Sequence, residues 1–328
     1  MSVNKHNIIN LALQGGGSHG AFTWGVLDRL LEDERLDIEG ISGASSGALN
    51  AAILAYGMAS DGRDGARSAL RNFWERVANE FSEIFQGSLL DTYLSLTQTF
   101  SPYQLNPLDM NPLRDLVVES IDFELLRKRC PIKLFIAATQ VRTGKLKIFE
   151  NKELSIDVLM ASTCVPSIHH AVKIEGEDYW DGGFSGNPAV FPLIFNCKHT
   201  DIIIVMLHPL ERPDTPTTAE EIQQRTSELS FSTAFLREMR AIAFSKKYIE
   251  SDWLPSGYLE KRMKKTNIHI IEDQALSSQY NLRSRYNTLP LFINRFYSEG
   301  YAAAEIWLEN KFDSLGKRSS VNLADIFC

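Results

Sequence analysis

The chain has 328 residues, of which 44% are hydrophobic and 23% charged, a balance that is ordinary for a folded globular protein. Its net charge of -7 gives no overall case for nucleic-acid binding. The four cysteines are scattered without a Cys-x-x-Cys pair, which argues against a disulfide framework or a zinc site. No apolar run reaches about 18 residues and the first residues carry no signal-peptide pattern, so we expect a cytoplasmic protein without membrane spans.

The first fifth of the chain alternates strands, glycine-rich turns and helices. Ile8 to Leu13 is predicted to be a buried strand, and Gly15-Gly16-Gly17-Ser18-His19-Gly20 follows it as a turn. Apolar residues at helical spacing then predict a helix over 21–33. Apolar and polar residues alternate from Arg35 to Ser42, which is typical of a short strand, and Ala48 to Tyr56 is rich in helix formers. This alternation implies a parallel sheet wrapped by helices.

The middle of the chain is predicted to add more strands and helices. We expect the second helix to end at Gly57, and a loop over 61–65 to precede an amphipathic helix over 66–85. Residues 87–111 are apolar and aromatic without a clear period, and could form a cap or lid. Strands are predicted over 132–139, 145–149, 171–180 (a hairpin) and 201–207, and helices beginning at Asn111, Ser155 and Asn187-Pro188.

A segment rich in proline marks the best candidate for a domain boundary. Pro209 to Pro216 interrupts the pattern, and the following residues are mostly helical in character. We therefore predict a core over 1–210 and a mainly helical extension over 211–328 that packs on it. Within the extension, helices are predicted over 217–250 and 289–310, with a strand over 268–271 between them.

Gly43-Ala44-Ser45-Ser46-Gly47 lies between a predicted strand and a predicted helix. In that context Gly-x-Ser-x-Gly predicts a nucleophile elbow, in which Gly43 and Gly47 leave room for a tight turn and Ser45 is exposed at the helix N-terminus. The alternative is that Ser45 only caps the helix, but a cap requires neither glycine. A serine nucleophile also needs a base and N–H donors for the oxyanion, and the backbone N–H of Ser46 is one expected donor.

The glycine-rich turn is the expected source of the other oxyanion donors. A strand that ends in Gly15 to Gly17 exposes backbone N–H groups, and the following helix adds positive potential. The same turn, continued to Gly20, matches a dinucleotide-binding fingerprint, with Glu34 or Asp37 as its acidic partner. Because the nucleotide hypothesis leaves Ser45 and its glycines unexplained, we favour the oxyanion hole.

Asp181 is the candidate base, in the run Asp181-Gly182-Gly183 at the end of the predicted hairpin. The two glycines allow a sharp turn that would hold the carboxylate out of the sheet, although an ordinary Asx-turn explains this run as well on local grounds. A Ser-His-Asp triad is a further alternative, with the histidine supplied by His199, His208 or His269. The pair His169-His170 lacks helical metal-ligand spacing, so we expect neither a metal nor a cofactor.

Taken together, the three motifs resemble the patatin-like phospholipase family in content and order, over about Ile8 to Leu207. The resemblance implies an α/β fold with a three-layer α/β/α core and a mostly parallel sheet. It also implies a hydrolase of lipid acyl esters that needs neither metal nor histidine, with Ser45 as nucleophile, Asp181 as base and the Gly15 to Gly17 amides as oxyanion hole. Residues 161–166 would belong to the acyl pocket wall.

The sequence departs from the family pattern at two positions. Family members often begin the glycine loop with aspartate, where this chain has Gln14, which changes only a polar neighbour. They often carry arginine or lysine where this chain has His19, which weakens the fixed positive charge that would help to bind an oxyanion or a phosphate. The preference for phospholipid over other esters is therefore left open. Two alternatives to a hydrolase also remain, an acyltransferase of similar architecture and a lipid-binding or regulatory protein that has kept the fold.

One segment of the extension is basic in an otherwise acidic protein. Residues 237–265 carry eight basic and four acidic side chains, interleaved with Phe235, Phe244, Tyr248 and Trp253. Such a segment could contact anionic lipid at a membrane surface, or it could be an ordinary solvated helix face. We therefore expect a lipid or phospholipid substrate, with peripheral membrane contact as an option, and no nucleic-acid partner. The sequence gives no indication of the oligomeric state.

Overall fold

A single mixed sheet runs through the protein. The computed structural model describes residues 6–82, 87–212, 214–250, 257–280 and 282–328. The strands are β1 (Asn7–Leu13), β2 (Leu36–Gly43), β3 (Lys133–Gln140), β4 (Leu146–Glu150), β5 (Val172–Ile174), β6 (Glu177–Asp181), β7 (Asp201–Val205) and β8 (Asn267–Ile271). Their order is β5-β6-β3-β2-β1-β7-β8, with β4 paired to β3. Strands β3, β2, β1, β7 and β8 run parallel to one another. Strands β4 and β6 each pair antiparallel with β3, and β5 pairs antiparallel with β6.

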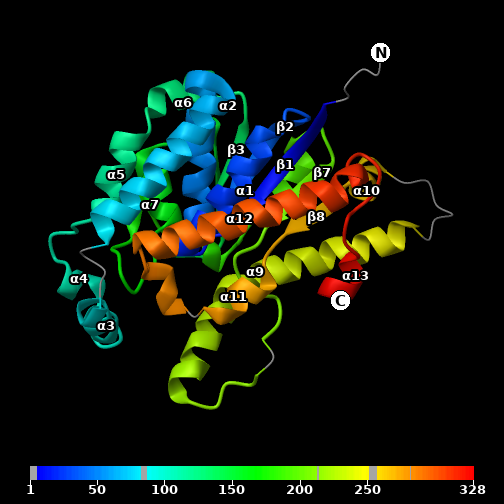
Figure 1. Cartoon of the computed structure of the whole chain (residues 1–328). Coiled ribbons are helices and arrows are strands. Elements are labelled where there is room, and N and C mark those ends of the chain that lie inside the picture. Colours follow the sequence, from blue (N-terminus) through cyan, green and yellow to red (C-terminus); the bar gives the residue numbers. More distant parts are fainter. Residues whose placement is uncertain (1–5, 83–86, 213, 251–256, 281) are drawn as a thin grey trace.

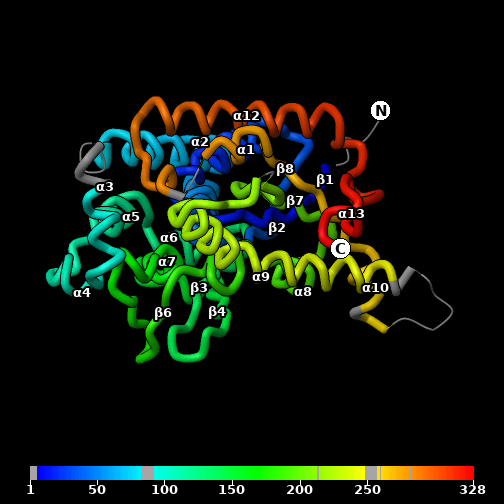
Figure 2. Tube along the Cα trace, turned by 90° about the horizontal axis from the view of Figure 1, so that it is seen from below, coloured from blue at the N-terminus to red at the C-terminus, as the bar shows by residue number. Residues whose placement is uncertain are grey.

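Helices cover both faces of this sheet. One layer contains α1 (Gly20–Glu32), α2 (Ser46–Phe81) and α12 (Pro290–Lys311), and the other contains α8 (Phe191–Asn196) and α9 (Ala219–Glu250), as Figures 1 and 2 show. The other helices are α3 (Gly87–Leu96), α4 (Pro102–Leu105), α5 (Pro112–Ser120), α6 (Phe123–Arg129), α7 (Ile156–Ser162), α10 (Tyr258–Lys265), α11 (Gln274–Gln279) and α13 (Leu323–Phe327). The predicted three-layer α/β/α fold is confirmed.

The apolar pattern of the strands explains the three layers. On β7, Ile203 and Val205 pack in the cluster beneath α1, α2 and α12, whereas Ile202 and Ile204 pack in the cluster beneath α8 and α9. Successive side chains of a strand point to opposite faces of a sheet. A strand that is apolar throughout therefore requires helices on both faces.

The helix after Ser45 passes the predicted end at Gly57 and breaks at Asp61 and Gly62, whose backbones are not helical. This break lies within the predicted loop over 61–65, and a further helical part follows it up to Phe81, so α2 consists of two helices joined by a kink. Gly57 serves a different purpose from the predicted helix end, because a Cβ at this position would lie only 2.4 Å from the Cα of Ala66. The glycine permits close packing between the two helical parts of α2.

Other differences concern the start of one helix and several short helices. The helix predicted to begin at Asn187-Pro188 begins at Phe191 instead, because the side chain of Asn187 accepts a hydrogen bond from the Gly15 N–H at 2.6 Å. The short helices α6, α10, α11 and α13 were not predicted. None has more than eight residues, which is too short for a hydrophobic period to be recognised.

The C-terminal part of the chain extends both the sheet and one helical layer. β8 pairs with β7, and α12 packs along α1. That helix contact depends on glycines, since a Cβ on Gly25 would lie 2.0 Å from the Tyr297 carbonyl oxygen and one on Gly300 2.0 Å from that of Phe22. The domain division at residue 210 stays a prediction. Within the described ranges, no helix is both long and apolar enough to cross a membrane.

Candidate active site

Three segments meet at the edge of the sheet where its parallel strands end. Leu13 pairs with Gly43 at the ends of β1 and β2, and Ala138 pairs with Asp181 across β3 and β6. Because the carboxyl ends of parallel strands share one edge of a sheet, the residues that follow β1 and β2 are neighbours there. The antiparallel strand β6 delivers Asp181 to the same edge. The candidate residues are thus brought together from three separate parts of the chain.

Ser45 occupies a strained turn between β2 and α2. Its φ of 53° and ψ of -125° are unusual for a residue other than glycine. The side chain accepts no N–H from α2, so it does not cap that helix. The backbone is held by Ser162, whose Oγ accepts the Ser45 N–H at 3.0 Å. Within residues 41–50, all of which the structure describes, Ser45 is the one residue that is not buried.

The glycines on either side of Ser45 are required by close contacts. A Cβ on Gly43 would lie 2.6 Å from the carbonyl oxygen of Gly47, and a Cβ on Gly47 would lie 2.2 Å from that of Leu13. Both distances are far below van der Waals contact, so a larger residue at either position would push the turn away from β1. The same packing leaves the Ser45 hydroxyl at the crest of the turn.

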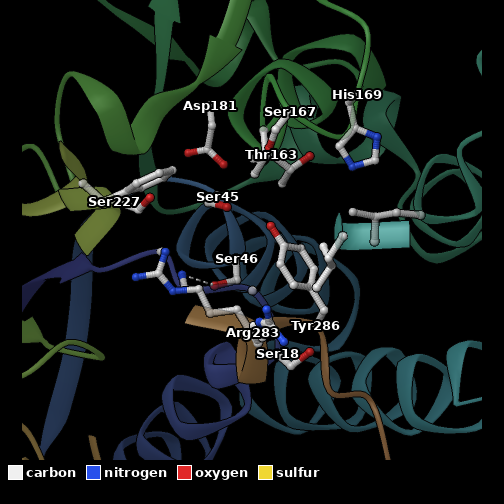
Figure 3. A pocket seen from close by; sticks show the side chains of 18 of the residues that line it. Ser18, Ser45, Ser46, Thr163, Ser167, His169, Asp181, Ser227, Arg283 and Tyr286 are labelled. Carbon is white, nitrogen blue, oxygen red and sulfur yellow. Dashed lines mark hydrogen bonds between the residues drawn. The ribbon is translucent and has the colours of Figure 1, made fainter. Parts of the chain in front are cut away.

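Asp181 is fully buried, and its carboxylate points toward Ser45 (Figure 3). Its Oδ1 accepts the N–H of Gly183 at 2.7 Å, which is the expected Asx-turn. Its Oδ2 has no hydrogen-bond partner among the described residues. Burial raises the pKa of this carboxyl to about 7, against the lowering effects of the Gly183 N–H, the nearby Ser45 side chain and the Arg285 charge. A group with this pKa and a free oxygen can accept a proton from the serine.

The glycine loop offers fewer free N–H groups than its sequence suggests. The N–H of Gly15 donates to Asn187 Oδ1 at 2.6 Å, and that of Gly16 donates to Ser46 Oγ at 2.9 Å. In the described part of the chain, the N–H groups of Gly17 and Ser46 meet no acceptor. Of the four predicted oxyanion donors, the N–H groups of Gly17 and Ser46 are therefore available. The N–H of Gly16 would become available if the Ser46 hydroxyl rotated away from it.

The remaining motif glycines lie against these groups. A Cβ on Gly20 would lie 2.7 Å from the Ser46 Cβ, and one on Gly182 would lie 2.2 Å from the Ala137 carbonyl oxygen. A Cβ on Gly183 would lie 2.3 Å from the ring of Phe231 on α9. These three positions leave no space for a side chain beside the candidate nucleophile and base.

A cavity of about 560 Å³ opens above Ser45, and its wall is largely apolar. Its apolar lining includes Leu49, Phe73, Trp74 and Val77 from α2. Thr163, Val165 and Pro166 line it as well, within the segment for which the resemblance implies an acyl pocket wall.

Part of the cavity wall comes from the C-terminal part of the chain and was missed from the sequence. The N-terminal half of α9 contributes Gln224, Ser227 and Phe231, and the 3-10 turn η4 (Leu282–Tyr286) contributes Arg285 and Tyr286. The α9 residues recur at helical spacing, but a polar helix gives no sign of which face is covered. No local motif marks η4.

The histidines considered for a triad do not line this cavity. His199 bonds to Glu39 at 2.8 Å, His269 to Asp201 at 3.1 Å, and the Nε2 of His208 to the Gly15 carbonyl oxygen at 2.9 Å. His169 does line the cavity, but Figure 3 shows it on the far side of Thr163 from Asp181. Among the described residues, no group of three or more histidine, cysteine or carboxylate side chains could hold a metal ion.

Comparison with known proteins agrees with this geometry. A family model described as "Patatin-like phospholipase" matches residues 11–194, more than half of the chain. The chain belongs to this family. The patatin-like match contains the glycine loop, the Ser45 turn and Asp181, and ends before α9 and η4. It confirms the family resemblance, and the family is one of lipid hydrolases. The glycine loop on which the nucleotide-binding alternative rests lies within the matched residues.

Individual relatives are more distant. The uncharacterized protein R571 of Acanthamoeba polyphaga mimivirus is 27% identical to this patatin-like chain in an alignment of 195 residues that covers 55% of this chain. The match spans only 60% of the viral protein. The crystal structure of VipD from Legionella pneumophila aligns with 93% of this chain and 67% of its own, with a TM-score of 0.41 and 16% identity.

The raised pKa of Asp181 predicts that stability depends on pH. Its ordinary pKa of 3.8 applies to the unfolded chain, whereas the folded value is about 7. Folding therefore favours the protonated carboxyl, and this stabilisation is complete below about pH 4 and lost as pH rises through about 7. Asp181→Asn, which stays neutral, should melt at a higher temperature than wild type at pH 8, and the difference should shrink toward pH 4.

Thermal unfolding of both proteins across this pH range measures the effect. Asp178→Asn, on an exposed position of the same strand, is the matched control and should show no such pH-dependent difference. Equal melting temperatures for wild type and Asp181→Asn at pH 8 would contradict the prediction.

Proposed function

We propose that this protein hydrolyses acyl esters of lipids, with Ser45 as the nucleophile and Asp181 as the base. The observation that carries the proposal is the free Oδ2 of the buried Asp181, which faces Ser45 at the floor of an apolar cavity. The family supplies the class of reaction, because patatin-like proteins are lipid acyl hydrolases as a group. The roles of individual residues are our inference from the geometry.

The first half of the reaction forms an acyl-enzyme. Ser45 Oγ attacks the ester carbonyl carbon while its proton passes to Asp181 Oδ2, and the carbonyl oxygen becomes an oxyanion. The free N–H groups of Gly17 and Ser46 are placed to bind it, and the N-terminus of α2 adds positive potential. When the tetrahedral intermediate collapses, the bond to the alcohol oxygen breaks and Asp181 returns the proton to the leaving alcohol.

The second half releases the fatty acid. A water molecule gives its proton to Asp181 and attacks the acyl carbon, and the bond to Ser45 Oγ then breaks as the serine regains a proton. The raised pKa assists both halves, since a carboxylate with a pKa near 7 is a better base than one near 3.8. In a free enzyme such contacts are often loose and tighten on substrate binding, which fits the absence of a hydrogen bond between the Ser45 hydroxyl and Oδ2.

The proposal predicts which side chains are essential for hydrolysis. Ser45→Ala and Asp181→Asn should each lower kcat about 10³-fold or more on a soluble acyl ester, because each removes one member of the nucleophile–base pair. Chromatography of the fatty acid released from the ester measures the loss of activity. Ser60→Ala, an exposed serine on the same helix, is the control and should keep full activity.

Two results would contradict this assignment. Activity that survives Ser45→Ala would remove the nucleophile. An acyl product that moves to an added alcohol in place of water would identify an acyltransferase instead.

We also propose that an apolar surface beside the cavity contacts lipid. Leu108 and Met110 are 80% and 67% exposed, unusual values for large apolar side chains. Asn111 and Pro112, which follow Met110 directly in the chain, line the cavity itself. The two exposed apolar side chains therefore lie next to the cavity wall in the chain, where a lipid substrate drawn from an aggregate would enter.

The basic segment of the extension is less suited to this role. Phe235 is buried and its ring packs against Phe327, so it cannot contact lipid. Phe244 is 38% exposed, whereas the Tyr248 side chain and Trp253 lie outside the described residues.

The double variant Leu108→Ser, Met110→Ser tests the lipid contact. Hydrolysis of phospholipid vesicles should fall about tenfold or more, because two large apolar side chains no longer enter the lipid surface. Turnover of a monomeric soluble ester should stay the same. Ile306→Ser, at a 60% exposed position of α12, is the matched control. An equal fall on both substrates, or no fall on vesicles, would reject the contact.

A further inference from the structure

Arg285 is the charged group of the cavity for which the ester mechanism has no role. Among the described residues, the charged side chains that line the cavity are Asp181, Glu220, Arg283 and Arg285. Glu220 and Arg283 form an ion pair at 3.4 Å. Asp181 faces Ser45. Arg285 makes no direct ion pair with a carboxylate in the described part of the chain, and the carboxylates of Asp181 and Glu228 attract it only from a greater distance.

The groups that directly contact the Arg285 guanidinium are neutral in the described part of the chain. Its Nη2 lies 3.2 Å from Nε2 and 3.3 Å from Nδ1 of His208, and the guanidinium carbon lies 5.4 Å from the centre of the Phe231 ring. Burial and the Arg285 charge hold the pKa of His208 well below its usual value, so this imidazole is uncharged. Burial also lowers the pKa of Arg285 to about 10, which still leaves it positive at neutral pH. A desolvated cation without a direct ion-pair partner costs free energy, and an anionic ligand in contact with it would lower that cost.

The fold places this cation beside the glycine loop. The Arg285 carbonyl oxygen lies 2.4 Å from the position that a Cβ on Gly17 would take, and the Arg285 charge lowers the pKa of Asp181. His19 holds η4 in place, since its Nε2 bonds to Ser284 Oγ at 2.8 Å and its ring stacks on Phe296. Burial lowers the pKa of His19 to about 3, so His19 carries no charge at neutral pH. The positive charge that the loop lacks is thus available from the C-terminal part of the chain.

We infer that Arg285 binds a phosphate group of the substrate, and that this protein acts on phosphate-bearing acyl esters. The inference rests on the proposed ester hydrolysis at Ser45 and names its substrate class. A planar guanidinium donates two parallel hydrogen bonds to a phosphate, which suits it to this ligand. With the phosphate at Arg285 and the acyl chain along the apolar wall of α2, the ester between them lies over Ser45.

Two substrates with the same acyl chain test the inference, a 1-acylglycerol 3-phosphate and the corresponding 1-acylglycerol. Wild type should favour the phosphate ester. Arg285→Gln should lower kcat/KM for the phosphate ester about 10- to 100-fold, the usual effect of losing a charged hydrogen-bond donor, and mainly through KM. The acylglycerol has no phosphate contact to lose, so its kcat/KM should fall less, and the preference for the phosphate ester should shrink about tenfold or more. Arg285→Lys should recover part of the preference. Arg129→Gln, at an exposed position outside the cavity, is the matched control and should leave the preference unchanged.

Two kinetic outcomes would overturn the inference. An equal loss on both substrates would show that Arg285 supports the glycine loop or the oxyanion and does not bind a phosphate. An unchanged preference in Arg285→Gln would show that it has no part in recognition. Thermal unfolding of each variant separates these outcomes from a failure to fold, and Arg285→Lys provides a second, conservative variant.

Protection of Ser45 from a fluorophosphonate label gives a readout that does not depend on turnover. Glycerol 3-phosphate should slow labelling of wild type and have at least about tenfold less effect on Arg285→Gln. Protection by inorganic phosphate without a preference for the phosphate ester would assign the site to free phosphate and overturn the substrate class. If neither ester were hydrolysed while Ser45 was still labelled, the proposed function would fail, and the protection result would still decide whether Arg285 binds phosphate.

Discussion

The close approach of β1 to the turn after β2 is the constraint on which the site depends. Gly47 lies directly against the Leu13 carbonyl oxygen, with no space for a side chain, and Gly43 lies against Gly47 in the same way. This packing holds Ser45 in a backbone conformation that it would not adopt in isolation. The surrounding sheet is buried on both faces, so it can support that strain. One consequence is that the Ser45 hydroxyl and the N–H groups of the glycine loop share one small space.

The environment of Asp181 is the second determinant. Complete burial makes the ionised carboxylate less stable and raises its pKa, while the Gly183 N–H fixes one oxygen and leaves the other free. The same feature that costs stability above about pH 7 makes the carboxylate a stronger base there. A fully solvated aspartate at this position would be more stable and less basic. The proposed chemistry therefore depends on keeping water away from this side chain, which the ring of Phe231 against Gly183 assists.

The sequence predicts the parts of the site that are local and misses those that depend on tertiary docking. Gly-x-Ser-x-Gly, the three glycines and Asp181-Gly182-Gly183 are short motifs with a clear strand or helix on each side. Arg285 and Phe231 lie on elements without a motif. Arg285 directly precedes α12, which docks on α1 through Gly25 and Gly300, and Phe231 lies on α9 against Gly183. Gly57 was misjudged for a related reason, since glycine marks both helix ends and close helix contacts and only the fold distinguishes them.

The central claim is that Ser45 becomes acylated during turnover. The most direct measurement is mass spectrometry of the protein quenched within milliseconds to seconds of mixing with a lysophospholipid, followed by peptide mapping. The account predicts a mass increase equal to one acyl group, carried by the peptide that contains Ser45 and removed on longer incubation. A turnover-competent protein that shows no acylated species under any quench condition, or one that carries the acyl group on another residue, would contradict the account.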